Sequence, residues 1–238
     1  MRRMPGVGFI FDCDGTLLDT MGAWLSMEDV FAARGGGRIE PAMRKALCTM
    51  TMPEEAAFLH KAFGVGSTPA ALEREIDEYF LSYYAEQACA KPGAHALVEE
   101  LARRDIPCAI ASSSPHAYLE AGLARTGMRT AFSAVFSTDD VGSSKRERAI
   151  YDAAARTLGS IPQTTWCFDD AAYALRAMRG AGFHTVGVYD RDTSGTLSQL
   201  RAIADTTVAS LEDVDVDALL DALQPASAGV QAVRLGCA

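Results

Sequence analysis

Two aspartates, Asp12 and Asp14, stand directly after the first apolar run of the chain, residues 7–11. A short and continuous apolar run is typical of a β-strand that is buried on both faces. Burying carboxylates at the end of such a strand costs free energy unless their charge is compensated, so their placement indicates a function. One carboxylate can act as a nucleophile, and a second one two residues later can transfer a proton if the turn curls back, which Gly15 would allow.

Polar side chains also follow the three apolar segments that come later in the chain. Ser112 and Ser113 follow the second segment, Lys145 comes shortly after the third, and Asp169 and Asp170 follow the fourth. Taken singly, a serine or an aspartate in such a place is usually a helix N-cap. Because ligands of parallel sheets bind beyond the carboxyl ends of the strands, we expect all of these side chains to meet in one crevice.

A metal ion is expected in that crevice. Four carboxylates would repel one another and raise one another's pKa unless a cation neutralised them, and oxygen ligands suit a hard ion such as Mg²⁺. The sequence therefore predicts a metal site formed by Asp12, Asp14, Asp169 and Asp170. The ion and the Lys145 ammonium would offset the negative charge of a phosphate ester that a carboxylate attacks.

The elements that position these residues alternate from residue 92 onward. Alternating strands and helices form a parallel sheet with helices on both faces, so the predicted fold class is α/β with a Rossmann-like core. We predict helices at 94–104, 115–126, 146–158 and 171–180, strands at 107–111, 134–136, 165–168 and 184–188, and weaker elements at 197–203 and 206–208.

The segment between the first strand and this alternating region is helical in its pattern. Thr68 and Pro69 form a helix start, and no β-type alternation occurs nearby. The apolar face of that helix is predicted to consist of Leu72, Ile76, Tyr79, Phe80 and Tyr83. We therefore expect an α-helical cap at 19–91 inserted into a core of 1–18 plus 92–224, with a loosely ordered tail at 225–238. Trp24, near the start of the insert, is a candidate for facing the substrate and equally a candidate for the interior of the cap.

The run from Phe11 to Asp19, FDCDGTLLD, resembles the first motif of the haloacid dehalogenase-like (HAD) phosphohydrolase superfamily, D-x-D-G-T-x-x-D. The subclass it resembles carries a helical cap inserted after that motif. This resemblance implies that Asp12 is the nucleophile and a metal ligand. It also implies that Asp14 is the acid and base, and that its backbone carbonyl binds Mg²⁺.

Three later segments resemble the other motifs of that superfamily. The strand that ends in Ser112 resembles the second motif, which gives Ser112, with Ser113 beside it, a phosphate-binding role. Lys145 matches the lysine of the third motif, which contacts the phosphate, although Arg146 stands where the family commonly has proline. The fourth motif matches at Asp169 and Asp170, with alanine at 171 where serine is frequent. The resemblance implies that Asp170 ligates the metal and that Asp169 supports it.

The resemblance implies an Mg²⁺-dependent phosphatase that hydrolyses a small phosphorylated metabolite, such as a sugar phosphate, through a phospho-aspartyl intermediate on Asp12. A phosphosugar mutase of the β-phosphoglucomutase type is the alternative, because it shares these motifs. Dehalogenation is disfavoured by Asp14, since a halide leaving group needs no acid. A catalytically silent binding or regulatory protein ranks below both, because none of the expected carboxylates is missing.

Composition restricts the partners and the location. The 238 residues carry a formal net charge of −9, which disfavours nucleic acid, and no stretch of about 18 apolar residues could span a membrane. The six cysteines include no Cys-x-x-Cys pair, and we predict buried, reduced thiols and a cytoplasmic protein. The apolar run at 7–11 is too short for a signal peptide. A monomer is the default expectation.

Overall fold

The computed structural model describes residues 6–47, 50–191 and 196–223. The predicted loose tail at 225–238 lies outside these described residues, as do Cys48 and Cys237.

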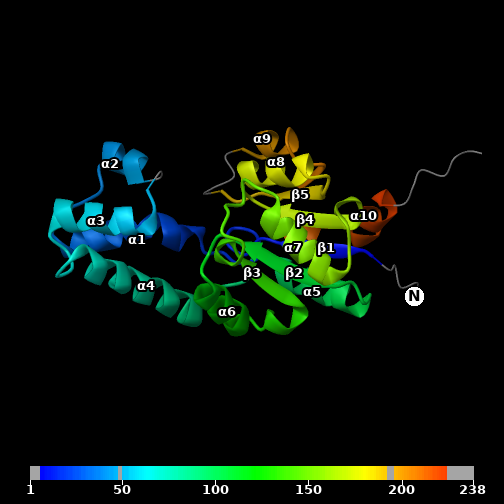
Figure 1. Ribbon diagram of the computed structural model, residues 1–238, viewed down its shortest axis with the longest axis horizontal. Coiled ribbons are helices and arrows are strands. Elements are labelled where there is room, and N and C mark those ends of the chain that lie inside the picture. The colour runs from blue at the N-terminus through cyan, green and yellow to red at the C-terminus, as the bar shows by residue number, and fades with distance from the viewer. Residues whose placement is uncertain (1–5, 48–49, 192–195, 224–238) are drawn as a thin grey trace, which may run out of the picture.

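A six-stranded parallel sheet forms the centre of the core (Figure 1). Its order is β3-β2-β1-β4-β5-β6, so the strand that ends at Asp12 lies in the middle, hydrogen-bonded to β2 on one side and to β4 on the other. This confirms the predicted α/β fold. The strands are β1 (Gly8–Phe11), β2 (Cys108–Ser112), β3 (Ala134–Ser137), β4 (Thr165–Asp169), β5 (His184–Val188) and β6 (Thr206–Val208).

Side chains of β1 point alternately to two apolar layers, and all four residues of the strand are buried. Phe9 and Phe11 lie on one face, where the Phe11 ring stacks on Phe168 of β4 with centroids 4.6 Å apart. Ile10 lies on the other face and packs in a second cluster with Cys167. Burial on both faces explains why the strand is apolar without interruption up to Asp12.

Helices cover both faces of the sheet. Leu97, Leu119 and Leu219 of α5, α6 and α10 pack in the layer of Phe9, whereas Ile150 and Leu175 of α7 and α8 pack in the layer of Ile10. The helices of the core are α5 (Ala94–Arg103), α6 (His116–Arg125), α7 (Ala149–Leu158), α8 (Ala172–Gly180), α9 (Leu197–Arg201) and α10 (Val216–Ala222). Short 3-10 turns lie at Arg129–Ala131, Thr138–Asp140, Pro162–Thr164 and Leu211–Asp213.

The helix predicted at 146–158 begins three residues later than expected, at Ala149. Residues 145–148 form a turn, which lets the Lys145 side chain enter the carboxyl end of the sheet. The Tyr151 hydroxyl holds this turn by donating to the Lys145 carbonyl at 2.9 Å.

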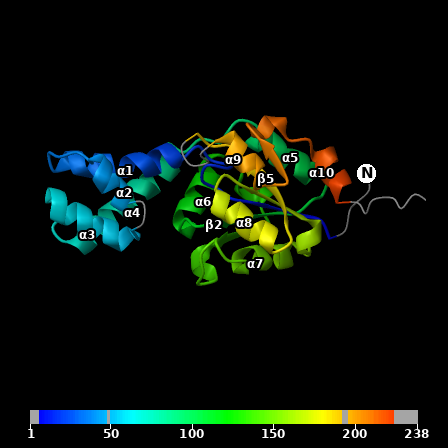
Figure 2. The same ribbon diagram turned by 90° about the horizontal axis from the view of Figure 1, so that it is seen from above.

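Four helices between β1 and α5 form a separate group at one end of the molecule, which we call the cap segment (residues 21–86; Figures 1 and 2). The two backbone connections between this segment and the core lie side by side. Leu18 bridges to Ala90, and the Asp19 amide donates to the Cys89 carbonyl at 2.9 Å. Lys91 fixes the junction further, because its ammonium reaches the Gly15 carbonyl at 2.8 Å and Asp190 at 2.7 Å. The helices are α1 (Met21–Arg34), α2 (Pro41–Leu47), α3 (Met52–Phe63) and α4 (Pro69–Glu86).

The buried face of α4 differs from the predicted one. Leu72, Ile76 and Phe80 are buried as expected, but the next buried residue is Tyr84, and Tyr79 and Tyr83 are only half-buried. The buried residues are spaced four apart along α4, and the last two, Phe80 and Tyr84, pack against Tyr118 of α6. The difference matters because Tyr84 reaches the site described below.

Three of the four cysteines that the structure describes are buried. Cys13, Cys108 and Cys167 are free and buried, as predicted, whereas Cys89 is exposed. The prediction for Cys89 is therefore wrong, because this residue lies in the loop that joins α4 to α5 rather than in a packed element.

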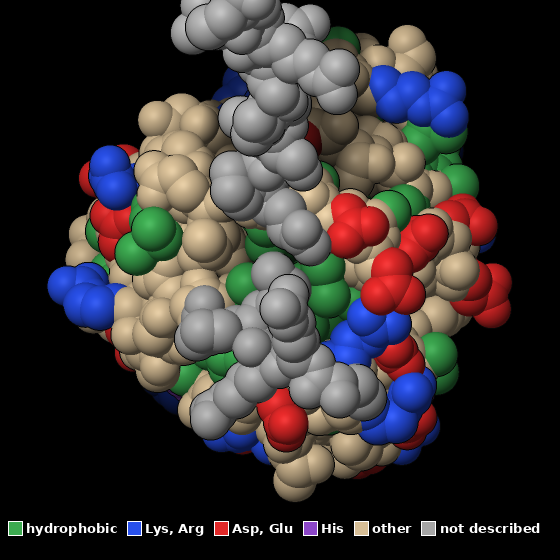
Figure 3. Space-filling view, turned by 90° about the vertical axis from the view of Figure 1, so that its right-hand side faces the viewer, with side chains coloured by type: hydrophobic (Ala, Val, Ile, Leu, Met, Phe, Trp, Pro, Cys, Tyr) green, Lys and Arg blue, Asp and Glu red, His purple; other side chains and the backbone are tan. Residues whose placement is uncertain are grey.

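The surface shows two further features. On the face opposite the cap segment, acidic and basic side chains are intermixed (Figure 3). Among the described residues, we found no helix with the length and apolar character needed to cross a membrane.

Candidate active site

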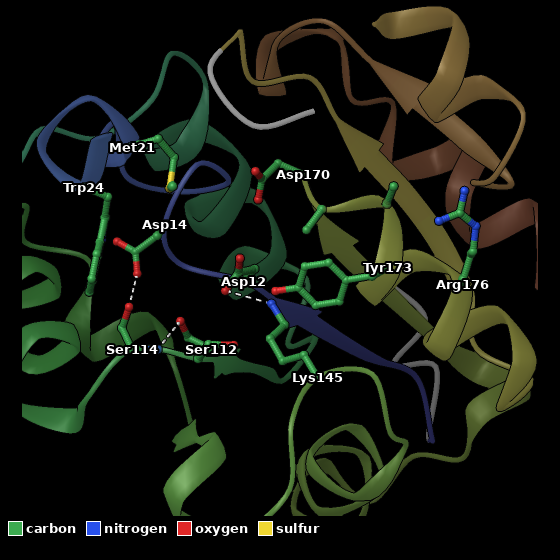
Figure 4. Close-up of a pocket in the computed structure, with 13 residues that line it drawn as sticks. Asp12, Asp14, Met21, Trp24, Ser112, Ser114, Lys145, Asp170, Tyr173 and Arg176 are labelled. Atoms are coloured by element: carbon green, nitrogen blue, oxygen red, sulfur yellow. Dashed lines mark hydrogen bonds and ion pairs between the residues drawn. The ribbon is translucent and has the colours of Figure 1, made fainter. Parts of the chain in front are cut away.

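A cavity of about 670 Å³ opens where the carboxyl ends of the central strands meet the first residues of the cap segment (Figure 4). A volume of this size is typical of sites for small molecules. The residues that line it are Asp12, Asp14, Met21, Trp24, Ser112, Ser113, Ser114, Lys145, Asp170, Ala171, Ala172, Tyr173 and Arg176. All of the candidate site residues predicted from the sequence line this cavity except Asp169, which is fully buried.

Lys145 connects two of the predicted carboxylates. Its ammonium lies 3.0 Å from Oδ1 of Asp12 and 2.5 Å from Oδ2 of Asp169, with its side chain only 2% exposed. Burial lowers the pKa of Lys145, but the charges of Asp12 and Asp169 outweigh burial and raise that pKa well above its usual value. The lysine is therefore a fixed positive charge beside Asp12.

A cation is needed to balance the charge that remains. Oxygens of Asp12, Asp169 and Asp170 lie within 4.8 Å of one another, and all three residues are buried. Lys145 is the only described partner of Oδ1 of Asp12 and of Oδ2 of Asp169, so these two carboxylates share one ammonium. Burial raises the pKa of Asp169 to about 6, although the charge of Lys145 opposes this rise. The donor set consists of hard oxygen atoms, and it fits a divalent cation such as Mg²⁺.

A tight turn after β1 brings Asp170 close to the backbone of the first motif. Gly15 has a φ of +75°, and a Cβ atom added there would lie 2.8 Å from Oδ2 of Asp170. Thr16 donates its hydroxyl to Oδ1 of Asp170 at 3.4 Å. Glycine at position 15 thus serves both the turn and the approach of the distal carboxylate.

Asp14 has surroundings of a different kind. Thr20 donates to its Oδ1 at 2.6 Å, Ser114 donates to its Oδ2 at 2.6 Å, and the Tyr84 hydroxyl also donates to Oδ1. Burial raises the pKa of Asp14, the charge of Asp12 adds to this, and the three hydroxyls oppose it. The Asp14 carboxylate lies outside the group of three carboxylates that could hold a metal ion. A buried carboxylate with a raised pKa suits proton transfer.

Ser112 and Ser113 begin the loop that leads into α6. Ser112 ends β2, is 1% exposed, and accepts a hydrogen bond from the Ser114 amide at 3.2 Å. Ser113 is exposed and lines the cavity. Because the N-terminus of α6 follows directly, this loop offers hydroxyls and amides to an anion.

Trp24 both lines the cavity and packs against the interior of the cap segment, the two placements that the sequence left open. Its ring lines the cavity, and it also stacks on Phe80 with centroids 4.0 Å apart. Its indole N–H donates to the Tyr84 hydroxyl at 2.9 Å.

Sequence reasoning missed several residues of the site. Thr20, Tyr84 and Ser114 surround Asp14, and Tyr173 and Arg176 line the cavity from α8. The last two follow Asp170 by three and six residues, so the spacing of a helix that begins after the fourth motif could have indicated them. The four-residue spacing of Leu72, Ile76 and Phe80 could have indicated that Tyr84 is buried, but not that it contacts Asp14.

Comparisons with known proteins agree with this arrangement. A family model described as haloacid dehalogenase-like hydrolase matches residues 8–182. Validoxylamine A 7'-phosphate phosphatase of Streptomyces hygroscopicus subsp. limoneus is 25% identical over 209 residues, which is 86% of this chain and 94% of that protein. Hexitol phosphatase A of Escherichia coli is 28% identical over 220 residues, covering 88% and 93%. The crystal structure of a putative beta-phosphoglucomutase from Thermotoga maritima has a TM-score of 0.74 and 22% identity, covering 91% of this chain and 98% of that one.

Proposed function

The chain belongs to the haloacid dehalogenase-like hydrolase family, and from this premise we propose that it is an Mg²⁺-dependent phosphatase of a small phosphorylated metabolite, such as a sugar phosphate. The observation that carries the proposal is the pairing of buried Asp12 with Lys145 inside a group of three carboxylates. Two relatives whose names specify phosphorylated sugars or sugar-like compounds support the substrate class.

In the first step, an oxygen of Asp12 attacks phosphorus, and the bond from phosphorus to the ester oxygen breaks. Asp14 donates a proton to the leaving alkoxide, which its raised pKa favours. Lys145, which contacts Asp12, offsets the charge of the phosphoryl oxygens. Ser112 and Ser113 bind a phosphoryl oxygen at the start of α6.

In the second step, Asp14 removes a proton from water, and the water oxygen attacks phosphorus. The bond to Asp12 breaks, which releases phosphate, restores the Asp12 carboxylate and leaves Asp14 protonated for the next cycle. Asp12, Asp170 and the backbone carbonyl of Asp14 would hold Mg²⁺, with Asp169 in support. The ion would supply positive charge that reduces the repulsion between the Asp12 nucleophile and its anionic substrate.

The cap segment would act as a mobile lid over the cavity and exclude water from the reaction. Trp24 and Met21, which line the cavity from this segment, would then contact the substrate. We further propose domain boundaries at 1–18 plus 92–224 for the core and 19–91 for the cap, a monomer, and a cytoplasmic location on the basis of the free thiols.

A phosphosugar mutase is the second candidate, because it would use the same pair of aspartates and differ only in returning the phosphoryl group to a sugar. Incubation with a hexose 1-phosphate and a bisphosphate primer separates the two. Free phosphate is the expected product, whereas isomerisation without free phosphate would overturn the phosphatase proposal.

The decisive experiment is a colour assay for released phosphate across sugar phosphates, nucleotides and phosphoglycolate, with Mg²⁺ and with EDTA. We expect release from at least one sugar phosphate, its loss in EDTA, and its recovery when Mg²⁺ is added in excess. Full activity in the chelator would exclude the metal from the reaction, and no release from any ester would contradict the proposed activity.

A further inference from the structure

A chain of two hydrogen bonds runs from the cap segment to Asp14. The indole N–H of Trp24 on α1 donates to the hydroxyl of Tyr84 on α4, and that hydroxyl donates to Oδ1 of Asp14. Since the tyrosine hydroxyl accepts one hydrogen bond and has a single hydrogen to give, the indole fixes the direction in which that hydrogen points. The chain therefore aims one donor at one oxygen of the carboxylate.

The Tyr84 ring is packed so that its hydroxyl has little freedom. The residue is fully buried, and its ring stacks on Tyr118 of α6 with centroids 5.3 Å apart. Gly122, four residues further along α6, also lies close, because an added Cβ there would come within 2.9 Å of the Tyr84 ring and 2.8 Å of Leu18. A side chain held in this way can hold its partner in turn.

The three hydroxyls around Asp14 come from three parts of the molecule. Thr20 belongs to the junction, Ser114 to the loop after β2, and Tyr84 to the last turns of α4. Thr20 and Tyr84 share Oδ1, whereas Ser114 contacts Oδ2. Of these three hydroxyls, only that of Tyr84 belongs to the cap segment, so it links the core aspartate to that segment.

We infer that Tyr84 is a positioning residue, whose hydroxyl, directed by Trp24, holds the Asp14 carboxylate in the orientation that exchanges a proton with the leaving group. This inference rests on the proposed phosphatase activity. It predicts that the hydroxyl matters most for esters whose leaving groups need a proton. Misplacing a catalytic group by a small distance costs up to about 10²-fold in rate.

The test compares Tyr84→Phe with wild type on two substrates, an alkyl phosphate such as a hexitol phosphate and the aryl ester p-nitrophenyl phosphate. The aryl leaving group is a weaker base and needs less help from an acid. We expect kcat/KM, which reports the steps up to release of the leaving group, to fall by about 10-fold to 10²-fold for the alkyl ester and by less than about 3-fold for the aryl ester. Hydrolysis of the phospho-aspartyl intermediate is common to both esters and also uses Asp14, so kcat alone does not separate them.

Tyr83→Phe is the matched control, because it removes a hydroxyl from the neighbouring residue of the same helix. That hydroxyl donates to the Asp19 carbonyl at 3.4 Å and does not reach Asp14. We expect the control to leave the ratio of the two rates unchanged. Equal losses of kcat/KM on both esters in Tyr84→Phe, or an equal change of the kcat/KM ratio in Tyr83→Phe, would overturn the inference while leaving the phosphatase activity established.

A double-mutant cycle separates positioning from general packing. If Tyr84 acts through Asp14, adding Tyr84→Phe to Asp14→Asn causes no further loss of kcat, whereas independent effects would multiply. Trp24→Phe is a second route if Tyr84→Phe folds poorly, since it removes the donor and keeps the tyrosine hydroxyl. Its expected effect is a smaller loss with the same preference for the alkyl ester, and a loss without that preference counts against the inference. A wild-type protein that releases phosphate from none of the esters tested, including the panel of sugar phosphates, would instead overturn the proposed function.

Discussion

The core and the cap segment both contain grouped charges, but they hold them differently. In the core, Lys145, Asp12 and Asp169 have side chains that are 2%, 9% and 0% exposed. In the cap segment, Arg44 pairs with Glu28 at 3.0 Å, and the arginine remains 35% exposed. The core group contains more carboxylates than its single lysine can balance, which fits a site that binds a cation, whereas the cap group pairs the buried Glu28 with an arginine that remains in contact with solvent.

The origin of these groups also differs. The core group joins residues more than a hundred positions apart, because parallel pairing brings β1 and β4 side by side with Phe11 opposite Phe168. The cap group joins neighbouring helices of one local bundle. Charged groups assembled by a sheet are held rigidly, so changes in the core should affect catalysis strongly and changes in the cap should affect mainly stability or pH dependence.

The largest effect is expected from Asp12→Asn, which removes the proposed nucleophile and hardly changes its volume. We expect kcat to fall by about 10⁴-fold or more, measured by phosphate release. Asp139→Asn, an exposed aspartate of the core, is the control and should retain full activity. Activity near the wild-type value in Asp12→Asn would show that the core group is not the catalytic centre.

Asp14→Asn should have the next largest effect. We expect a fall of at least about 10²-fold in kcat on a sugar phosphate, the usual scale for lost acid and base catalysis. The fall in kcat/KM should be smaller on p-nitrophenyl phosphate, because kcat/KM reports the transfer to Asp12 and this leaving group needs less protonation. A variant that keeps the wild-type rate on both esters would remove Asp14 from proton transfer.

The placement of Asp12 and Asp14 in the cavity could be predicted from the sequence because their motif is local. Nine consecutive residues contain the first motif, and the apolar strand that leads into it places the motif at the carboxyl end of a central strand. The alternating pattern after residue 92 likewise predicted the order of strands and helices in the core. Residues at strand ends could be assigned to one crevice because parallel topology leaves few other arrangements.

Tyr84 could not be foreseen in the same way. Its contact with Asp14 spans 70 residues and depends on where α4 packs against α6, which no local pattern specifies. The placement of Trp24 was undecided for the same reason, since helical spacing predicts the buried face of a helix but not the neighbour that buries it. The cap segment is therefore where the sequence says least about the substrate.

Lys145→Met tests the charge balance of the core. Removing the ammonium leaves Asp12 and Asp169 without their described partner, and loss of one member of a buried ion pair typically costs about 3–5 kcal/mol of stability. We expect a lower Tm without metal and a larger rise of Tm on adding Mg²⁺ than in wild type, because the ion then balances more uncompensated charge. Lys61→Met, on α3 of the cap segment and exposed, is the control. A variant with unchanged Tm would contradict the role of Lys145 as a counter-ion.

The smallest effect concerns Glu55 in the cap segment, and it is a pH dependence rather than a loss of rate. Burial, with a smaller contribution from the charge of Glu28, raises the pKa of Glu55 to about 7 from an ordinary 4.5. Burial also raises the pKa of Glu28, although Arg44 opposes this and Asp29 adds to it.

The sign of the effect follows from proton binding. Between pH 4.5 and 7 the folded protein holds the Glu55 proton more tightly than the unfolded chain does, so this group contributes most to stability in acid and its contribution declines up to pH 7. Glutamine is neutral throughout. Glu55→Gln should therefore match wild type at pH 5 and exceed its Tm by about 2 °C at pH 8, a small value because the side chain is only half-buried.

Glu54→Gln provides the matched control on the adjacent residue. Hydrogen bonds from Thr51 lower the pKa of Glu54 below 4.5, so this carboxylate stays ionised between pH 5 and 8 and its removal should leave the pH dependence of Tm as in wild type. Phosphatase activity at pH 7 should be unchanged in both variants, because neither glutamate lines the cavity. If Glu55→Gln instead lowered activity and left the pH dependence of Tm intact, the charges of the cap segment would belong to the catalytic machinery, and the distinction between the two regions would fail.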